Sequence, residues 1–322
     1  MAMMQQPIVP RSTTTLQFEN ERVTIQHELG RGAFGVVYRV QDVATFNLYA
    51  LKAIPCVNAL ALQEAVREAE MLREISHPNI ISLRGTKQVL DAQGQLYMFL
   101  LTDYCPGGNL NQRLPRSSND QVNLTWMKQM ASAVAYLHSQ NVVHRDLKPD
   151  NVLLTSTEDV KLGDFGLARG YIALTQIQVN GQNTEVRYYM RSEVGTKYYM
   201  APEVFRSDGY SEKADVFSLG VLLYAILERD FIRIDGKAYY GAFVNTYMGK
   251  IGLGFALAIQ IPFTDITFLG YLSTYGSLQM LIRQALNYDP HNRPSAEQVY
   301  ENLAAIEESF NEECKNEECN NE

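Results

Sequence analysis

The chain has 322 residues and a net charge of −8, which comes from 28 basic against 36 acidic side chains. A hydrophobic content of 46% with 20% charged residues is ordinary for a soluble globular protein, and it excludes a chain that is disordered throughout. This balance leaves no basic excess that could follow nucleic-acid phosphates, so we expect no DNA or RNA partner.

The four cysteines and the apolar runs favour an intracellular protein. The cysteines form no C-x-x-C pair, so a zinc site or a disulfide framework is disfavoured. The longest apolar runs, near 216–227 and 251–261, are shorter than the roughly 18–20 residues that a bilayer span needs. We therefore expect a cytoplasmic or nuclear location and no membrane partner.

Residues 18–103 have the pattern of a small β-rich lobe. Residues 1–17, before them, are expected to form a flexible leader. The lobe contains β-branched and aromatic runs such as VTIQHEL, GVVYRV, LYALKAI and QLYMFLL, which turn residues separate. One helical segment interrupts the strands, and its apolar positions are Leu62, Val66, Ala69, Leu72 and Ile75.

Helical patterns dominate after a hinge expected at 103–108. Residues 109–305 include LTWMKQMASAVAYLHSQ, KADVFSLGVLLYAILE and SLQMLIRQAL, which predict a larger, mostly helical lobe and an α+β fold overall. Within it, 229–275 has mixed periodicity and receives no assignment. Seven glutamates against one lysine make 306–322 an acidic tail, which we expect to be disordered.

The run LGRGAFGVVYRV places Gly30, Gly32 and Gly35 in G-x-G-x-x-G spacing. In the dinucleotide-binding form of this motif the glycines open a helix. Here Val36 and Val37 continue as a strand, which puts the glycines at the tip of a hairpin. Such a tip suits a loop that folds over nucleotide phosphates, because its backbone N–H groups can approach them closely. A plain tight hairpin is the alternative.

Lys52 lies in the strand-like run YALKAI, where a buried charge needs a partner. The alternative is an edge-strand lysine with its ammonium group in water. At about 100° per residue, Glu68 shares the inward stripe of Leu72 on the helix that follows, whereas Glu70 faces solvent. We expect an ion pair between Lys52 and Glu68, with Glu64 as the second choice.

Two further motifs give the strongest functional indication. They are VVHRDLKPDNVLL at 142–154 and KLGDFGLA at 161–168. With the glycine loop, the lysine, the helix glutamate and Ala-Pro-Glu at 201–203, they make the chain resemble the eukaryotic protein kinases over residues 20–305. The resemblance implies a bilobal protein kinase fold over 18–305.

The resemblance also implies a role for each polar residue of these motifs. Phosphoryl transfer needs positioning and charge neutralisation more than covalent chemistry. Asp146 resembles the base that orients the acceptor hydroxyl, and Asn151 and Asp164 resemble the ligands of two Mg²⁺ ions. Lys148, which would reach the transferred phosphate, and Thr196 are typical of the serine/threonine branch. The implied reaction is transfer of the ATP γ-phosphate to Ser or Thr of a protein substrate.

ATP and Mg²⁺ are the cofactors that the resemblance implies. The residues expected to bind the nucleotide are Leu29, Gly30, Gly32, Gly35, Val37, Ala50, Lys52, Thr102 as gatekeeper, Asp103, Cys105 and Leu153. Val37, Ala50 and Leu153 would enclose the adenine, whose edge would bond the backbone at Asp103 and Cys105.

Several supporting contacts follow from the same resemblance. An apolar column would join the two lobes through Leu72, Leu83, His144 and Phe165. Asp215, early in a helix that reads as buried, would anchor the backbone of the catalytic loop, because an unpaired carboxylate there would be costly. Glu203 would pair with Arg293.

The 40 residues from Asp164 to Glu203 are the expected activation segment. Its insert at 171–186 alternates apolar and polar residues around an Asn-Gly turn, which predicts a small hairpin. Ser192 matches the main activating phosphosite of kinases that the chain resembles, and Arg145 could bind its phosphate bidentately. An upstream kinase or autophosphorylation would add that phosphate.

Two alternatives to an active protein kinase stay open. A pseudokinase scaffold would bind ATP without efficient transfer, although every catalytic position named above is present. A small-molecule phosphotransferase is disfavoured by the Ala-Pro-Glu segment, which organises a peptide substrate. Within the protein kinases, the runs GTKYYMAPEVF and KADVFSLGVLLYAILER are similar to the PDLIM-interacting (Clik-type) serine/threonine kinases.

Overall fold

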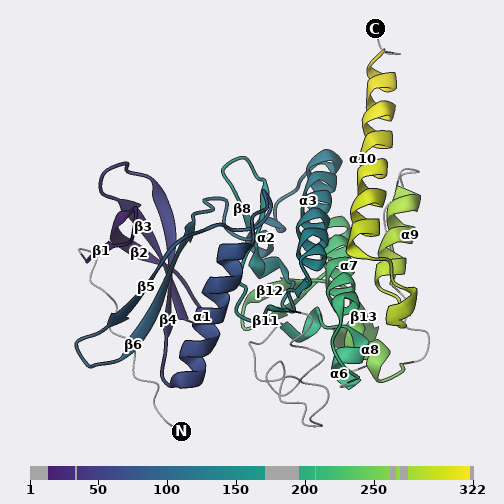
Figure 1. The fold of residues 1–322 in the computed structure, drawn as a ribbon. Helices are drawn as coiled ribbons and strands as arrows, with labels where there is room; N and C mark the ends of the chain where they lie inside the picture. The colour runs from purple at the N-terminus through teal and green to yellow at the C-terminus, as the bar shows by residue number, and fades with distance from the viewer. Residues whose placement is uncertain are drawn as a thin grey trace. The chain divides into compact units, whose positions relative to one another are not determined.

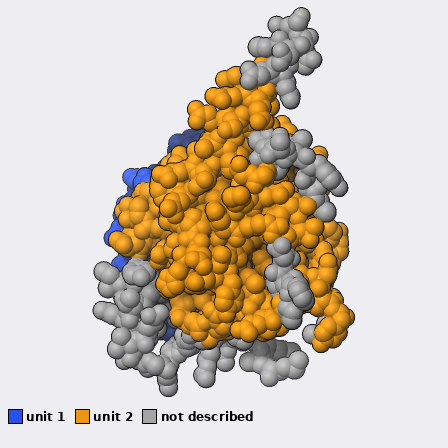
Figure 2. Space-filling view, turned by 90° about the vertical axis from the view of Figure 1, so that its right-hand side faces the viewer, with its two compact units in different colours: residues 1–76, 81–106 blue, residues 77–80, 107–322 orange. Residues whose placement is uncertain are grey.

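The structure is a computed structural model, and the residues that it describes are 14–32, 35–170, 196–206, 208–247, 249–261, 266–268 and 275–319. The chain divides into two compact units (Figure 2). The first contains residues 1–76 and 81–106, and the second contains residues 77–80 and 107–322. The α+β fold class is confirmed, because a β-sheet dominates the first unit and helices dominate the second (Figure 1).

The first unit is built on a six-stranded antiparallel sheet of order β1-β2-β3-β4-β6-β5. Its strands are β1 (Thr15–Gln17), β2 (Arg22–Gly32), β3 (Gly35–Asp42), β4 (Leu48–Pro55), β5 (Leu83–Leu90) and β6 (Leu96–Asp103). Strand β3 alternates strictly, with Val36, Tyr38 and Val40 buried and Val37 on the half-exposed face. This alternation is what a sheet with one buried face requires.

Strand β1 corrects the predicted leader, which was expected to be flexible up to residue 17. Thr15 pairs with Thr24 of β2, and Leu16 is buried in the sheet core beside Phe18. The segment is ordered because these two side chains fill the core. A three-residue strand gives too short an alternation for the sequence to show it.

Helix α1 (Ala59–Glu74) covers the part of the sheet formed by β4 and β6. It begins at Asn58, whose side chain accepts a hydrogen bond from the Ala61 N–H, as an N-cap residue does. Ala65 and Ala69 face the sheet and pack in one cluster with Ile54, Met98 and Leu100. Small residues at these two positions let the helix approach the sheet closely.

Helices form most of the second unit. They are α2 (Leu110–Arg113), α3 (Asp120–Ser139), α6 (Pro202–Arg206), α7 (Glu212–Glu228), α8 (Leu253–Ala258), α9 (Tyr275–Ala285) and α10 (Ala296–Cys319), with 3₁₀ turns η1 (Pro149–Asn151), η2 (Thr196–Tyr198) and η3 (Pro290–Asn292). Helix α7 is buried all round from Ala214 to Ile226, as a helix that is apolar on every face should be. Trp126 of α3 is buried and donates its indole N–H to the Glu158 carbonyl at 2.8 Å.

Two short antiparallel pairs frame the loop between α3 and the Asp-Phe-Gly motif. Strand β7 (Val142–Val143) pairs with β10 (Arg169–Gly170), and β8 (Val152–Leu154) pairs with β9 (Val160–Leu162). The catalytic loop, residues 144–151, therefore begins after one pair and ends at the other.

The region that the sequence left unassigned contains two β-hairpins. Strands β11 (Phe231–Ile234) and β12 (Lys237–Tyr240) form the first, and β13 (Phe243–Thr246) and β14 (Gly249–Gly252) form the second. Asp235 and Gly236, the two-residue loop of the first hairpin, both have positive φ, 50° and 80°. Asp-Gly is a preferred sequence for such a loop, so this dipeptide was a hairpin indication that the sequence reading missed.

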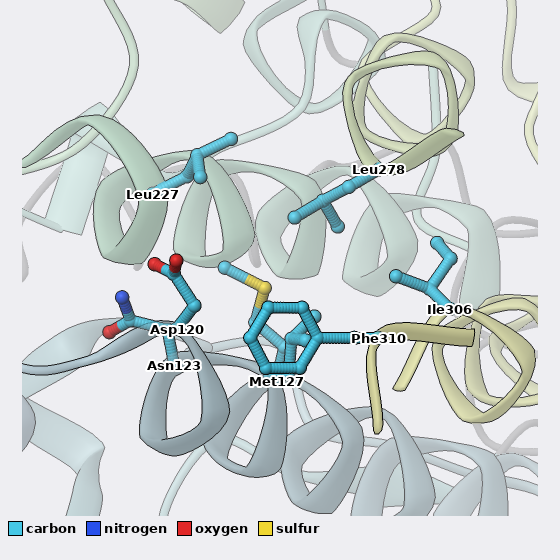
Figure 3. A pocket seen from close by; sticks show the side chains of 8 residues that line it. Asp120, Asn123, Met127, Leu227, Leu278, Ile306 and Phe310 are labelled. Atoms are coloured by element: carbon cyan, nitrogen blue, oxygen red, sulfur yellow. The ribbon is translucent and has the colours of Figure 1, made fainter. Parts of the chain in front are cut away.

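Helix α10 corrects the C-terminal boundary, because the tail predicted to be disordered from residue 306 continues as helix to Cys319. Ile306 and Phe310 line an apolar pocket of about 20 Å³ together with Met127 of α3 and Leu278 of α9 (Figure 3). Glu307 is buried, and its carboxylate accepts from the side chains of Gln121, Thr125 and Lys128. These contacts order the start of the tail, while its acidic end extends past the neighbouring helices (Figure 1).

Within the described ranges, no helix combines the length and the apolarity that a membrane crossing requires.

The packing of α10 predicts different effects for two C-terminal deletions. Removing 306–322 takes away Ile306, Phe310 and the partner of Lys128, so we expect the free energy of unfolding to fall by about 2–5 kcal/mol. Removing 312–322 takes away only the acidic end and should change it by less than about 0.5 kcal/mol. Thermal and urea unfolding of the full chain and both variants measure this, and equal stabilities would contradict it.

Candidate active site

The catalytic loop is held by one buried carboxylate of α7. Asp215 is 0% exposed, and its two oxygens accept from the backbone N–H groups of His144 at 2.7 Å and Arg145 at 2.8 Å. Tyr210 donates its hydroxyl to the same group at 2.8 Å, and His138 Nε2 lies 3.1 Å from it. The predicted anchoring role of Asp215 is confirmed by these contacts.

The hydrogen bonds to Asp215 also decide its charge. Burial alone would raise the pKa of the Asp215 carboxyl, but the bond from His138, the nearby histidines and the Arg145 N–H together lower it below the usual value. Asp215 is therefore a carboxylate in the folded state.

Asp146 lies at the centre of the loop with its two oxygens in different surroundings. It is 4% exposed, Lys148 Nζ lies 2.8 Å from Oδ2, and Asn151 Nδ2 donates to the same oxygen at 2.9 Å. Its other oxygen, Oδ1, is buried and has no hydrogen-bond partner among the described residues. Such an oxygen is costly unless a further ligand uses it.

The pKa of Asp146 is raised by its surroundings. Burial is the main cause of the rise, and the neighbouring carboxylate of Asp164 also raises the pKa. Lys148 opposes both effects and lowers it. The net result is a stronger base than a free aspartate.

The ladder between β8 and β9 brings the two predicted metal ligands together. Val152 pairs with Leu162, so Asn151 lies beside Gly163, whose N–H donates to the Asn151 carbonyl at 2.9 Å. Asp164 is the next residue and has a positive φ of 58°. Its carboxylate is near enough to Asp146 to raise the pKa of that residue.

The residues present fit a magnesium ion held partly by the protein and partly by phosphates. The side-chain amide of Asn151 uses its nitrogen for both bonds to Asp146. The oxygen of the same amide is therefore a candidate metal ligand, together with the carboxylate of Asp164. No group of three or more His, Cys, Asp or Glu side chains that could cage a metal occurs in the described part of the chain. Mg²⁺ typically takes one or two carboxylates plus substrate phosphates, so this donor set is suitable.

Lys52 of β4 and Glu68 of α1 form the predicted ion pair in the first unit. Lys52 Nζ lies 2.8 Å from Glu68 Oε1, and the side chains are 16% and 6% exposed. Glu68 is a buried residue of the helix, whereas Glu64, the second choice, is not. The phase of the apolar stripe therefore identified the partner correctly.

The glycines lie at the predicted hairpin tip. Gly30 pairs with Val37 and Gly32 with Gly35, across the end of β2 and β3. Gly35 has a φ of 137°, and a Cβ there would lie 2.1 Å from the Ala53 carbonyl oxygen, so only glycine fits.

The strand register places the other residues of the first unit that are expected to bind the nucleotide. Ala50 pairs with Thr102, and Val37 pairs with Lys52, so these four side chains belong to the half-exposed face. Leu29, on β2, is 42% exposed. Asp103, with Cys105 two residues further on, ends β6, and its N–H donates to the Ser82 carbonyl at 3.2 Å.

Two expectations depend on contacts between the units and stay predictions. One is enclosure of the adenine by Val37 and Ala50 with Leu153, which lies in β8 of the second unit. The other is the apolar column, of which the second unit supplies His144 and Phe165, with ring centroids 5.0 Å apart.

The activation segment is described only at its two ends. Ser192 and the predicted hairpin at 171–186 lie outside the described residues, and Thr196 belongs to the turn η2. Tyr199 is buried and donates its hydroxyl to the Tyr240 carbonyl at 2.8 Å. Arg145, the expected phosphate partner, is 6% exposed.

Two further ion pairs surround the loop. Arg293 binds Glu203 of the Ala-Pro-Glu segment through two bonds of 2.6 and 2.8 Å, as predicted. Lys237 of β12 lies 2.6 Å from Asp150 Oδ1, next to Asn151, and the sequence reading missed this pair. The Asp235-Gly236 turn, which places Lys237 at the start of a strand, was the available indication.

Comparison with known proteins agrees with this geometry. The family model described as a protein kinase domain matches residues 23–303. Serine/threonine-protein kinase 1 of Arabidopsis thaliana is 33% identical over 228 residues, which cover 68% of this chain and 25% of that protein. The match thus spans about a quarter of the length of this curated relative.

The Asp215→Asn variant should lose both stability and its acid dependence. Its amide NH₂ would face a backbone N–H in place of an acceptor, so we expect the free energy of unfolding to fall by about 3–5 kcal/mol. Because the folded pKa of Asp215 is lowered, its stabilisation is present above the unfolded value of about 3.9 and is lost as the pH falls through the folded value.

Urea unfolding between pH 7 and pH 2 measures the Asp215 effect. The wild type should lose more stability than Asp215→Asn on acidification below about pH 4. Asp208→Asn is the control, since Asp208 is 53% exposed and its partner is Arg206. Parallel pH profiles for wild type and Asp215→Asn would refute the assignment.

Proposed function

We propose that this chain, a member of the protein kinase family, is a serine/threonine protein kinase that transfers the γ-phosphate of ATP to protein hydroxyls. The observation that carries the proposal is Asp146, a buried carboxylate with a raised pKa and one oxygen that has no hydrogen-bond partner within the described ranges. The similarity to a serine/threonine-protein kinase supports the choice of acceptor, at 33% identity.

Asp146 would act on the acceptor hydroxyl. Its Oδ2 is held by Lys148 and Asn151, so the carboxylate is oriented and Oδ1 is left to accept the hydroxyl hydrogen. The proton passes to Asp146 as the hydroxyl oxygen attacks the phosphorus, and the bond from phosphorus to ADP breaks. Lys148, held beside Asp146, would neutralise charge on the transferred group.

Charge neutralisation would be shared among three other groups. Bound Mg²⁺ supplies Lewis-acid stabilisation of the phosphate oxygens. Asn151 and Asp164 would hold it, because their oxygen atoms suit this ion and lie at the end of the same ladder. Lys52 would grip the nucleotide phosphates, with Glu68 keeping its ammonium group in place.

Regulation by phosphorylation is part of the same proposal. A phosphate on Ser192, added by an upstream kinase or by autophosphorylation, would be bound by Arg145. Thr196 would bond Asp146 and Lys148. The similarity to the Clik-type kinases, and a cytoplasmic or nuclear location, stay predictions.

The Asp146→Asn variant tests the activity. We expect phosphate transfer to generic protein substrates with Mg·ATP to fall by roughly 10²–10⁴-fold, because the amide cannot accept the proton. Radioactive phosphate incorporation measures this, with thermal unfolding to show that the variant folds. Equal incorporation by the two proteins would exclude Asp146 as the base, and no incorporation by either would contradict the proposed activity and favour an ATP-binding scaffold.

The pH dependence of transfer should follow the ionisation of Asp146. Activity rises as Asp146 loses its proton, and its raised pKa places the acidic limb of kcat/KM above the range of a free aspartate. Lys148 lowers this pKa, so Lys148→Met should move the limb to higher pH, besides reducing kcat. Normalised pH profiles measure the shift, and a shift to lower pH would exclude Asp146 as the titrating base.

A further inference from the structure

The hairpin of β11 and β12 supplies no residue to the proposed reaction, yet it contacts elements that do. Three residues of β12 make side-chain or carbonyl contacts to other parts of the second unit: Lys237, Ala238 and Tyr240. Tyr239, the fourth, is buried with its ring near Tyr198. A two-stranded hairpin is marginal by itself, so these contacts hold it in place.

Lys237 connects the hairpin to the catalytic loop. Its Nζ lies 2.6 Å from Asp150 Oδ1 and 4.8 Å from the centre of the Tyr239 ring, so a carboxylate and an aromatic face orient it together. Asp150 directly precedes Asn151, whose amide holds Asp146 through two bonds of 2.8 and 2.9 Å. Three residues of the loop therefore separate Asp150 from the proposed base Asp146, and the side chain of Asn151 joins the two ends of this stretch.

The outer edge of β12 is attached to the same unit at two points. Asn111 of α2 donates to the Ala238 carbonyl at 2.8 Å, and Tyr199 donates to the Tyr240 carbonyl at 2.8 Å. Carbonyls two residues apart point to the same side of a strand, so both bonds lie on the edge away from β11. This edge is fixed, and it can hold Lys237 at a constant place.

Aromatic packing extends the attachment to the end of the activation segment. Tyr198 lies 6.2 Å from Tyr239 and 5.7 Å from Phe243, measured between ring centroids. Strand β12 thus joins the catalytic loop, α2 and the residues that precede Ala-Pro-Glu.

We propose that Lys237 is a positioning residue, whose ion pair with Asp150 fastens the catalytic loop to β12 and keeps Asp146 and Asn151 in place for transfer. The inference rests on the proposed kinase activity. The two side chains are 49% and 22% exposed, so the pair adds little to global stability. A small displacement of reacting groups, in contrast, can reduce a rate strongly.

The chain offers a matched control for this residue. Lys250 of β14 pairs with Asp230, also at the surface of the hairpin region, and its ion pair does not reach the catalytic loop. The variants are Lys237→Ala, Lys237→Arg as the conservative replacement, and Lys250→Ala, each made in the full chain.

Hydrogen exchange tests, without an activity assay, whether the ion pair of Lys237 with Asp150 holds the catalytic loop. The Asn151 N–H donates to the Lys148 carbonyl at 3.0 Å, and the Val152 N–H donates to the Pro149 carbonyl. We expect Lys237→Ala to increase exchange in the peptide 148–152 severalfold, with an unchanged melting temperature. Lys250→Ala and Lys237→Arg should leave this exchange as in the wild type. Unchanged exchange in Lys237→Ala would overturn the proposal.

Kinetics test the consequence for transfer. With a protein substrate and Mg·ATP, Lys237→Ala should lower kcat by roughly threefold to tenfold and leave both KM values unchanged. Lys237→Arg should restore most of kcat. In an Asp150→Asn background, Lys237→Ala should cost nothing further, since its partner is already lost. An additive loss in that background would assign Lys237 a role other than holding Asp150.

The two proposals fail in different ways. If the wild type and Asp146→Asn both transfer no phosphate, the proposed function fails, and the exchange data alone decide whether Lys237 holds the loop. If the wild type is active and Lys237→Ala equals it in kcat, the proposed function stands and Lys237 is no positioning residue.

Discussion

The buried carboxylate of Asp215 is the constraint on which the catalytic loop depends. A charge with 0% exposure is tolerated only where hydrogen bonds replace water, and here the donors include the backbone N–H groups of His144 and Arg145. Because α7 is enclosed by the core on all sides, it holds Asp215 rigidly against the loop. Asp146, the proposed base, comes directly after these two anchored residues, so its position follows from the burial of a helix rather than from the loop's own sequence.

The same anchoring offsets backbone strain. Arg145 and Asp164 have φ angles of 71° and 58°, a left-handed conformation that costs roughly 1–3 kcal/mol for residues other than glycine. The Arg145 N–H is bonded to Asp215, and Gly163, just before Asp164, is bonded on both sides, to Asn151 and to His144. The strain at these two positions is thus offset by hydrogen bonds from the surrounding core. This arrangement fixes the positions of Asp146 and Asp164 before any ligand binds, which is the preorganisation that phosphoryl transfer needs.

Two kinds of contact could be predicted from the sequence: those that follow from helical periodicity, and those that a buried charge or a recognised motif requires. Helical phase selected Glu68 for Lys52, and the cost of a buried charge supported the anchor expected at Asp215. The pair of Glu203 with Arg293 followed from the resemblance to protein kinases. Contacts that depend on a single tertiary neighbour could not be predicted. Strand β1 is ordered by two side chains, and the start of the tail is ordered by partners of Glu307 more than 170 residues away in the chain. Local composition at both ends indicated disorder because it holds no information about these neighbours.

The region after α7 shows the same limit within the candidate site. Its strands have four residues each, too few for alternation to distinguish them from loops, and only the Asp235-Gly236 turn marks them. Yet this region approaches the end of the activation segment as closely as packing allows, since a Cβ on Gly254 of α8 would lie 1.9 Å from the Met200 carbonyl oxygen. Such a contact allows no side chain at position 254 and places the backbone of α8 directly against Met200. The sequence motifs indicate the chemistry of the candidate site. The region after α7, whose strands are short and weakly patterned, holds the end of the activation segment next to that site.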